Sequence, residues 1–117
     1  MLIQMLKSKI HRAKVTDCNL NYEGSISIAE ELLAEAKIYE FERVDVLNIN
    51  NGERFSTYAV ASKKPGEICI NGAAARLALP GDLVIIISYA NLENSSLLNK
   101  WKPYIVKVNE WNEVTKK

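Results

Sequence analysis

The chain has 117 residues, a size that suits one domain, and its 15 Lys and Arg against 14 Asp and Glu leave a net charge of +1. Hydrophobic residues make up 48% of it, enough to form a core. The balanced charge argues against a nucleic-acid partner, and the longest uncharged apolar stretch, residues 83–92, is about half the length of a membrane helix. Because the first residues lack a secretory signal, we expect a cytoplasmic protein with reduced cysteines.

Runs of β-branched and aromatic residues predict a mainly β fold. Tight-turn signals at residues 50–52, 64–66 and 80–82 separate several of these runs. Many short strands joined by tight turns are typical of a small barrel. The predicted strands cover residues 1–9, 13–19, 44–49, 54–61, 68–70, 83–89 and 104–108.

Two short helices are also expected. Ser27 and Glu30 have the spacing of a capping box, which predicts a helix over about residues 28–37. An alanine-rich run, residues 73–79, predicts a second helix with Asn71 as its N-cap. Small side chains at its start either leave backbone N–H groups open to an oxygen ligand or simply allow close packing.

Common catalytic motifs do not occur in the sequence. His11 is the single histidine, and Cys18 and Cys69 are far apart, so the ligand spacing of a zinc site is missing. There is no serine-nucleophile motif and no glycine-rich phosphate loop. An enzyme built on this chain would therefore need a reactive group from outside the ordinary side chains.

Strand alternation groups several polar side chains. Lys7, Lys9 and His11 share one face of the first strand, which is either a solvated edge or an anion pocket. Arg54 and Tyr58 share a face of a later strand. An arginine can hold a carboxylate with two hydrogen bonds and a tyrosine can transfer a proton, although surface positions are the simpler interpretation of these residues taken singly.

Four sequence blocks occur together at spacings typical of a known family. The blocks are Lys9-Ile10-His11-Arg12, Tyr22-Glu23-Gly24-Ser25, residues 51–58 (NGERFSTY) and residues 71–76 (NGAAAR). With these blocks the chain closely resembles the aspartate 1-decarboxylases, pyruvoyl-dependent enzymes that make β-alanine for pantothenate. The resemblance extends to about Val108, and residues 109–117 look like a variable polar tail.

The resemblance implies a six-stranded double-psi β-barrel that assembles as a homotetramer with active sites between subunits. It also implies a zymogen that cuts itself between Gly24 and Ser25, giving a β-chain of residues 1–24 and an α-chain of residues 25–117. Ser25 would become a covalently bound pyruvoyl group, and no metal is implied. The chemistry of the residues agrees, because a serine hydroxyl can attack the preceding carbonyl and Gly24 can adopt strained backbone angles.

The resemblance further implies that L-aspartate forms a Schiff base with the pyruvoyl group and loses CO2 to give β-alanine. Tyr58 is then the proton donor, Arg54 and Lys9 are cationic substrate contacts, and Thr57 aids self-cleavage and lies near the substrate. Strict alternation puts Thr57 and Tyr58 on opposite faces, so both reach one pocket only if the strand ends or bulges there. The remaining implied substrate contacts are Asn71, Gly72, Ala73 and Ala74, whereas His11 receives no role.

Two other functions stay open at this point. The same chemistry on a longer diacid such as glutamate is compatible with the sequence. A small barrel that binds a ligand and never cleaves is the non-enzymatic alternative, because a fold does not specify a function. A helper protein for self-cleavage is neither implied nor excluded.

Overall fold

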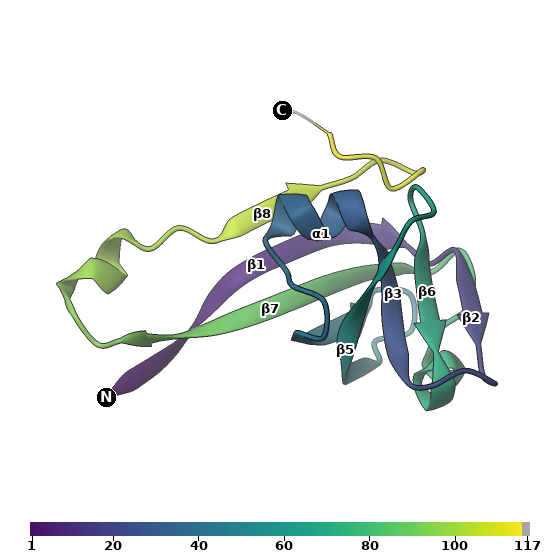
Figure 1. Ribbon diagram of the computed structural model, residues 1–117, viewed down its shortest axis with the longest axis horizontal. Coiled ribbons are helices and arrows are strands. Elements are labelled where there is room, and N and C mark those ends of the chain that lie inside the picture. Colours follow the sequence, from purple (N-terminus) through teal and green to yellow (C-terminus); the bar gives the residue numbers. More distant parts are fainter. Residues whose placement is uncertain (116–117) are drawn as a thin grey trace.

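Strands dominate the computed structural model, which describes residues 1–115 (Figure 1). None of the helices in this described part has the length and apolar character needed to cross a membrane. The strands are β1 (Leu2–Lys14), β2 (Asp17–Asn19), β3 (Ser25–Ala29), β4 (Arg43–Asn48), β5 (Arg54–Ser62), β6 (Ile68–Asn71), β7 (Leu83–Glu93) and β8 (Tyr104–Lys107). The α-helix is α1 (Glu30–Ala36), and the 3-10 helices are η1 (Gly72–Leu77) and η2 (Ser96–Lys100).

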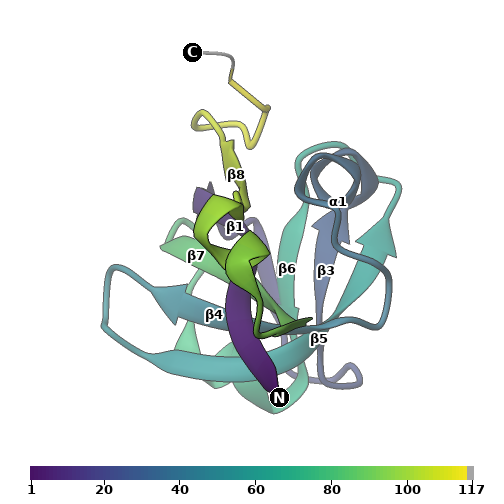
Figure 2. The same cartoon turned by 90° about the vertical axis from the view of Figure 1, so that its left-hand side faces the viewer.

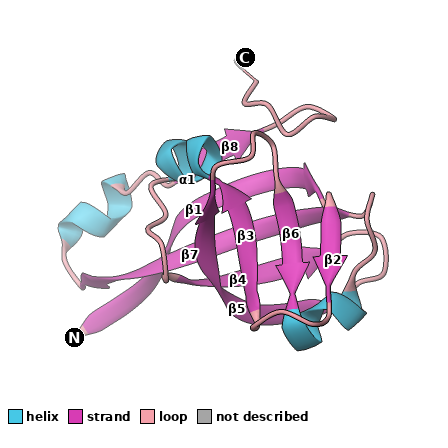
Figure 3. Ribbon diagram, turned by 45° about the vertical axis from the view of Figure 1, so that its right-hand side comes forward, coloured by secondary structure: helices cyan, strands magenta, loops and turns pink. Residues whose placement is uncertain are grey.

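The eight strands described form one sheet in the hydrogen-bonded order β2-β6-β3-β5-β4-β7-β1-β8. Strand β5 joins its two halves, because it pairs antiparallel with β4 and parallel with β3. In Figure 3, β3, β6 and β2 stand across β1, β7 and β4, so the sheet folds back on itself. Helix α1 and strand β8 lie together on one side of these strands (Figure 2).

The core sits between the two halves of the folded sheet. Alternate residues of β3 and β6, namely Ile26, Ile28, Ile68 and Ile70, are completely buried. Valines of β4 and β7 meet them in the same hydrophobic cluster. Each fully buried side chain of this size contributes about 1.5–3 kcal/mol, so the alternating isoleucines hold β3 and β6 firmly in register.

The first predicted helix begins later than the capping box suggests. Residues 25–29 form strand β3, and α1 starts at Glu30 with Ala29 as an N-cap that makes no side-chain hydrogen bond. Ser27 pairs with Cys69 instead of capping a helix. The capping-box prediction is therefore wrong, because burial of the β3 isoleucines outweighs the local helix signal.

The second predicted helix is present as a short 3-10 helix. Asn71 precedes η1 as its N-cap residue, as expected, but the Asn71 side chain makes no capping hydrogen bond. Its amide instead donates to the hydroxyls of Ser25 and Ser27 on β3.

Strand β1 continues beyond its predicted end and is irregular at two points. Its register against β7 shifts between Leu6 and Ser8, and the ammonium group of Lys7, at this bulge, lies 2.8 Å from a carboxylate oxygen of Glu42. A second shift follows Ile10, next to a left-handed φ of 62° at Arg12. Lys7 is thus held in an ion pair and is not an open cation beside Lys9.

The segment after β8 packs against the rest of the sheet. The Asn112 side chain is 1% exposed, and its amide bonds the backbone N–H and C=O of Lys14 and the C=O of Gly66. Residues 109–115 are therefore fixed in place, because one buried amide there satisfies three backbone groups. Residues 116 and 117 lie outside the described part of the chain.

Candidate functional site

Strands β3 and β6 carry a polar face opposite their buried isoleucines. Antiparallel pairing sets Ser25 opposite Asn71 and Ser27 opposite Cys69, so these four side chains share one face. Burial of this face is deep, since Ser25 is 1% exposed and Asn71 3%. Polar groups buried to this degree need hydrogen-bond partners, and here they find them in one another.

The Asn71 amide is the centre of this polar face. Its Nδ2 atom donates to Ser25 Oγ and to Ser27 Oγ, each at 3.0 Å. Its Oδ1 atom accepts a hydrogen bond from the Cys69 thiol at 3.2 Å. Ser25 Oγ in turn donates to the backbone carbonyl of Glu23 at 3.3 Å. The Ser25 hydroxyl is therefore fixed from two sides, by Asn71 and by the Glu23 carbonyl.

Burial, together with the nearby Asp17 and Glu67 carboxylates, raises the pKa of the Cys69 thiol to about 11. The thiol consequently keeps its proton at neutral pH and remains a hydrogen-bond donor to Asn71. Burial likewise raises the pKa of Cys18, whose thiol donates to the carbonyl of Ala78 at 3.4 Å.

Gly72 packs directly on the segment that contains Gly24. Gly72 has a left-handed φ of +74°, and a Cβ at this position would lie 2.6 Å from Gly24 Cα and 2.8 Å from Gly24 N. A Cβ on Gly24 would meet no atom within 4 Å, and Gly24 itself has no left-handed φ. The glycine that needs a left-handed φ and has no room for a Cβ is thus Gly72, whereas the sequence pointed to Gly24.

Tyr58 lies beside Ser25 on the neighbouring strand. Ile26 pairs with Ala59 in the parallel β3–β5 ladder, so Ser25 and Tyr58, the residues before them, stand on one face about 5 Å apart. Asn71 flanks Ser25 on its other side. These three side chains form a row across β6, β3 and β5, and Tyr58 remains 36% exposed.

Other predicted site residues lie farther from Ser25 within one chain. Strand β5 pairs with β4 without a shift from Arg54 to Tyr58, so no bulge turns Thr57 toward the Tyr58 face. Arg54 is on the Tyr58 face but about 13 Å earlier along the strand. Lys9 pairs with Ile87 on β7, and three strands separate β1 from β3 in the sheet order.

The remaining predicted contacts lie around η1 and at the far end of β1. Ala73 and Ala74 follow Gly72 in η1, and Ala74 packs partly against the core. His11 lines a cavity of about 530 Å3 together with three cationic side chains, those of Arg12, Lys14 and Lys107. Desolvation and the charges of Lys9, Arg12 and Lys107 lower the pKa of His11.

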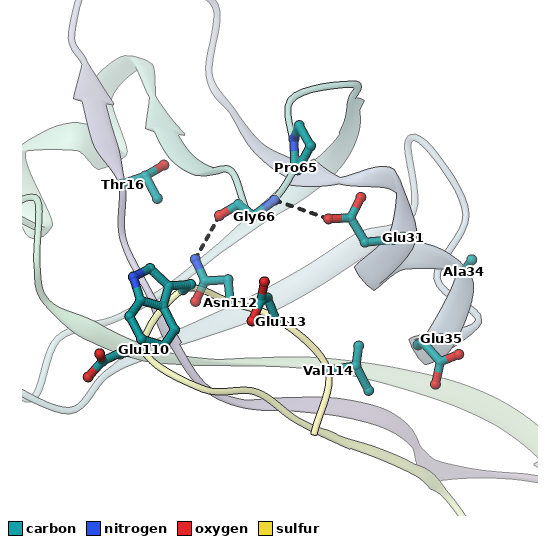
Figure 4. Close-up of a pocket in the computed structure, with 11 residues that line it drawn as sticks. Thr16, Glu31, Ala34, Glu35, Pro65, Gly66, Glu110, Asn112, Glu113 and Val114 are labelled. Carbon is teal, nitrogen blue, oxygen red and sulfur yellow. Dashed lines mark hydrogen bonds between the residues drawn. The ribbon is translucent and has the colours of Figure 1, made fainter. Parts of the chain in front are cut away.

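A cavity of about 860 Å3 opens between α1, the turn at Pro65-Gly66 and the C-terminal segment (Figure 4). The Gly66 N–H donates to Glu31 at 3.0 Å, and the Gly66 carbonyl accepts from Asn112 at 2.8 Å. None of the predicted site residues lines this cavity. Four glutamates do, namely Glu31, Glu35, Glu110 and Glu113. This acidic lining would repel a dicarboxylate, so volume alone does not locate the reactive centre.

Sequence reasoning missed Ser27 and Cys69 as members of the polar face. The signal was the alternation Ser-Ile-Ser-Ile at residues 25–28 against Ile-Cys-Ile-Asn at residues 68–71. Within residues 1–115, His, Cys, Asp and Glu side chains form no group of three that could hold a metal ion.

Comparison with known proteins identifies the family. The family described as "Aspartate decarboxylase" matches residues 1–115. A Campylobacter hominis protein named "Aspartate 1-decarboxylase" is 63% identical, over 97% of this chain and 97% of its own length. Proteins of the same name from Helicobacter acinonychis and Helicobacter pylori strain HPAG1 are 57% and 55% identical over the whole of both chains. The chain belongs to the aspartate decarboxylase family.

Proposed function

We propose that this chain removes the C1 carboxylate of L-aspartate with the help of a pyruvoyl group made from its own Ser25. Aspartate decarboxylation, a lyase reaction, is the activity of the chain, and the product β-alanine supplies pantothenate synthesis. The structural observation that supports the pyruvoyl route is the buried Ser25 hydroxyl, held by the Asn71 amide at 3.0 Å and by the Glu23 carbonyl at 3.3 Å. The two unpaired cysteines fit the cytoplasmic location that we propose.

Self-cleavage would begin with attack of Ser25 Oγ on the carbonyl carbon of Gly24. The C–N bond breaks as the C–O bond of an ester forms, and the hydroxyl proton ends on the nitrogen of residue 25. Loss of the residue 25 α-proton then expels the Gly24 carboxylate and leaves dehydroalanine. Water hydrolyses the resulting enamine, so one water is consumed and one ammonia is released for each chain cut into residues 1–24 and 25–117.

The surroundings of Ser25 fit this chemistry. As the ester breaks, negative charge develops on Oγ, and an N–H donor 3.0 Å away stabilises that charge. Gly72 packs so closely on the Gly24 backbone that a Cβ would not fit between them, and this close packing would limit the motion of the attacked peptide bond. Once present, the pyruvoyl group would supply a keto carbon that binds the substrate amine and draws electrons from the bond to the departing carboxylate.

The chain's own residues would bind the substrate and move its protons. Tyr58, beside Ser25, would donate the proton to the α-carbon, and Thr57 would assist self-cleavage. Arg54 and Lys9 would hold the substrate carboxylates through charge-assisted hydrogen bonds. The backbone of Asn71, Gly72, Ala73 and Ala74 would complete the substrate contacts.

Arg54 and Lys9 would reach this site from a neighbouring copy of the chain. This proposal is supported by the roughly 13 Å between Arg54 and Tyr58 along β5, and by the pairing of Lys9 with β7 and β8, neither of which pairs with β3. A homotetramer with active sites between subunits would bring these cations to Ser25.

The barrel itself would be the six-stranded double-psi type. Strand β1 leads through residues 15 and 16 directly into β2, where Val15 N–H bonds the Asp82 carbonyl and Thr16 N–H the Ile68 carbonyl. If β1 and β2 are one bent strand and β8 is an addition at the edge, six strands remain. They would follow one another around a ring in the order β1/β2, β6, β3, β5, β4 and β7, which supports the barrel proposal.

The activity can be tested by incubating the purified chain with L-aspartate or with L-glutamate and analysing the amino acids formed. We expect β-alanine from aspartate and no comparable formation of γ-aminobutyrate from glutamate. Turnover of glutamate at a similar kcat/KM would change the substrate assignment. Absence of product from both, with the chain folded and cleaved, would contradict the enzymatic function.

A further inference from the structure

We propose that Cys69 is a positioning residue for self-cleavage and that it acts through the Asn71 amide on the Ser25 hydroxyl. The inference rests on the proposed self-cleavage at Ser25 and adds a residue that the family resemblance does not include. It derives from the buried thiol bonded to Asn71 Oδ1 at 3.2 Å, on the same sheet face as Ser25.

The two ends of an asparagine amide have nearly the same shape, so their partners decide which end faces which way. Serine hydroxyls decide it less firmly, because a hydroxyl can turn. Ser25 Oγ donates to the Glu23 carbonyl, but it can turn to donate to an amide oxygen instead, so Ser25 and Ser27 do not by themselves fix the Asn71 amide. The Cys69 thiol is a donor and only a weak acceptor, so it selects the orientation in which Oδ1 faces the sulfur and the NH2 group faces the serines.

Self-cleavage requires this orientation. When Ser25 Oγ becomes an ester oxygen and then part of a carboxylate, it has no proton to donate and can only accept. An N–H group at 3.0 Å then stabilises the reacting oxygen. The flipped amide would place Oδ1 there, and two oxygens without a proton between them repel each other. Cys69 thus favours cleavage without touching the reacting atoms.

Ser27 completes the arrangement. The NH2 group of Asn71 has two hydrogens, and Ser25 and Ser27 each accept one of them. With the thiol on Oδ1, each end of this 3% exposed amide is satisfied. The arrangement holds the amide in one orientation before the chain is cut.

The test compares self-cleavage rates after cell-free synthesis, followed by intact mass spectrometry. Cys69→Ala and the bulkier Cys69→Val remove the thiol donor, and we expect each to slow cleavage about tenfold. Cys69→Ser restores a donor, and we expect a rate within about threefold of wild type. Cys18→Ala is the matched control, because the Cys18 thiol bonds the Ala78 carbonyl and not Asn71. Its cleavage rate should equal that of wild type.

Circular dichroism checks that each variant is folded. Cys69→Ala and Cys69→Val both lack the thiol donor, so the test still works if one of them misfolds. Cleavage of folded Cys69→Ala or Cys69→Val at the wild-type rate would overturn the inference and leave the proposed function intact. Equal slowing in Cys69→Ser and the donor-free variants would also overturn it, because the hydrogen bond would then not be the cause. A wild-type chain that never cleaves would overturn the proposed function itself.

Discussion

Gly72 and Gly24 touch through their backbones, and a Cβ on Gly72 would lie 2.6 Å from the Gly24 Cα. Gly72→Ala would introduce this clash. It would also place an alanine at a left-handed φ, which costs the folded state about 1–3 kcal/mol. We expect Gly72→Ala to displace the Gly24–Ser25 peptide bond and to slow self-cleavage at least tenfold, as measured by gel electrophoresis over time.

Gly24→Ala is the matched control, since a Cβ there meets nothing within 4 Å. This variant should fold normally and should be cleaved faster than Gly72→Ala. Equal cleavage of wild type and Gly72→Ala would show that the contact between the two backbones does not matter.

Tyr58→Phe should separate self-cleavage from turnover. The substitution keeps the ring beside Ser25, including its contact with Phe41 at 6.3 Å between ring centres, and removes only the phenol hydroxyl that carries the proton. We expect normal cleavage and a substrate adduct that borohydride can trap, but β-alanine release at least tenfold slower. Trapping and product release are measured on one preparation. Wild-type β-alanine release would remove Tyr58 as the proton donor.

A mixture of two inactive chains tests whether Arg54 comes from a neighbouring subunit. Arg54→Ala chains would cleave but lack the carboxylate contact, and Ser25→Ala chains would keep Arg54 but never cleave. Co-expression in equal amounts should recover about a quarter of the wild-type activity, because a complete site needs one chain of each kind. No recovery, with mixed oligomers demonstrated by mass spectrometry, would place Arg54 and Ser25 of an active site on one chain.

The ion pair of Lys7 and Glu42 predicts a pH-dependent contribution to stability. Desolvation raises the pKa of Glu42, but hydrogen bonds from Lys7, Ser88 and the Tyr39 N–H outweigh it, so the net pKa is below its ordinary 4.5. A carboxylate with a lowered folded-state pKa stabilises the fold above pH 4.5 and loses that contribution as the pH falls through the folded-state value.

We therefore expect Glu42→Gln to lower the free energy of unfolding by about 2 kcal/mol at pH 7, measured by urea denaturation. The difference from wild type should shrink as the pH falls below 4.5. A difference that stays constant down to pH 3 would contradict the assignment.

Most strands could be predicted from the sequence because their alternation is strong, as in residues 44–49 and 54–61, which became β4 and β5. Strand β3 could not, because Ser27 and Glu30 form a good local capping signal and only the pairing with β6 reveals a strand. The polar face was missed for the same reason, since its members Ser27 and Cys69 meet only through that pairing.

The docked C-terminal segment also depends on distant contacts. A polar sequence does not show that the Asn112 amide will bond the backbone of Lys14, which is 98 residues away. Tyr58 and Ser25 were both found by resemblance, and their adjacency then follows from the register of two parallel strands. In contrast, the separation of Lys9 from Ser25 depends on the strand order, which the sequence does not reveal.

Mass spectrometry of the purified wild-type chain under denaturing conditions shows directly whether Ser25 becomes a pyruvoyl group. We expect two fragments, residues 1–24 and residues 25–117, with no free amino group at the start of the larger one, whereas Ser25→Ala stays in one piece. A wild-type chain that remains whole and still converts L-aspartate to β-alanine would contradict the account.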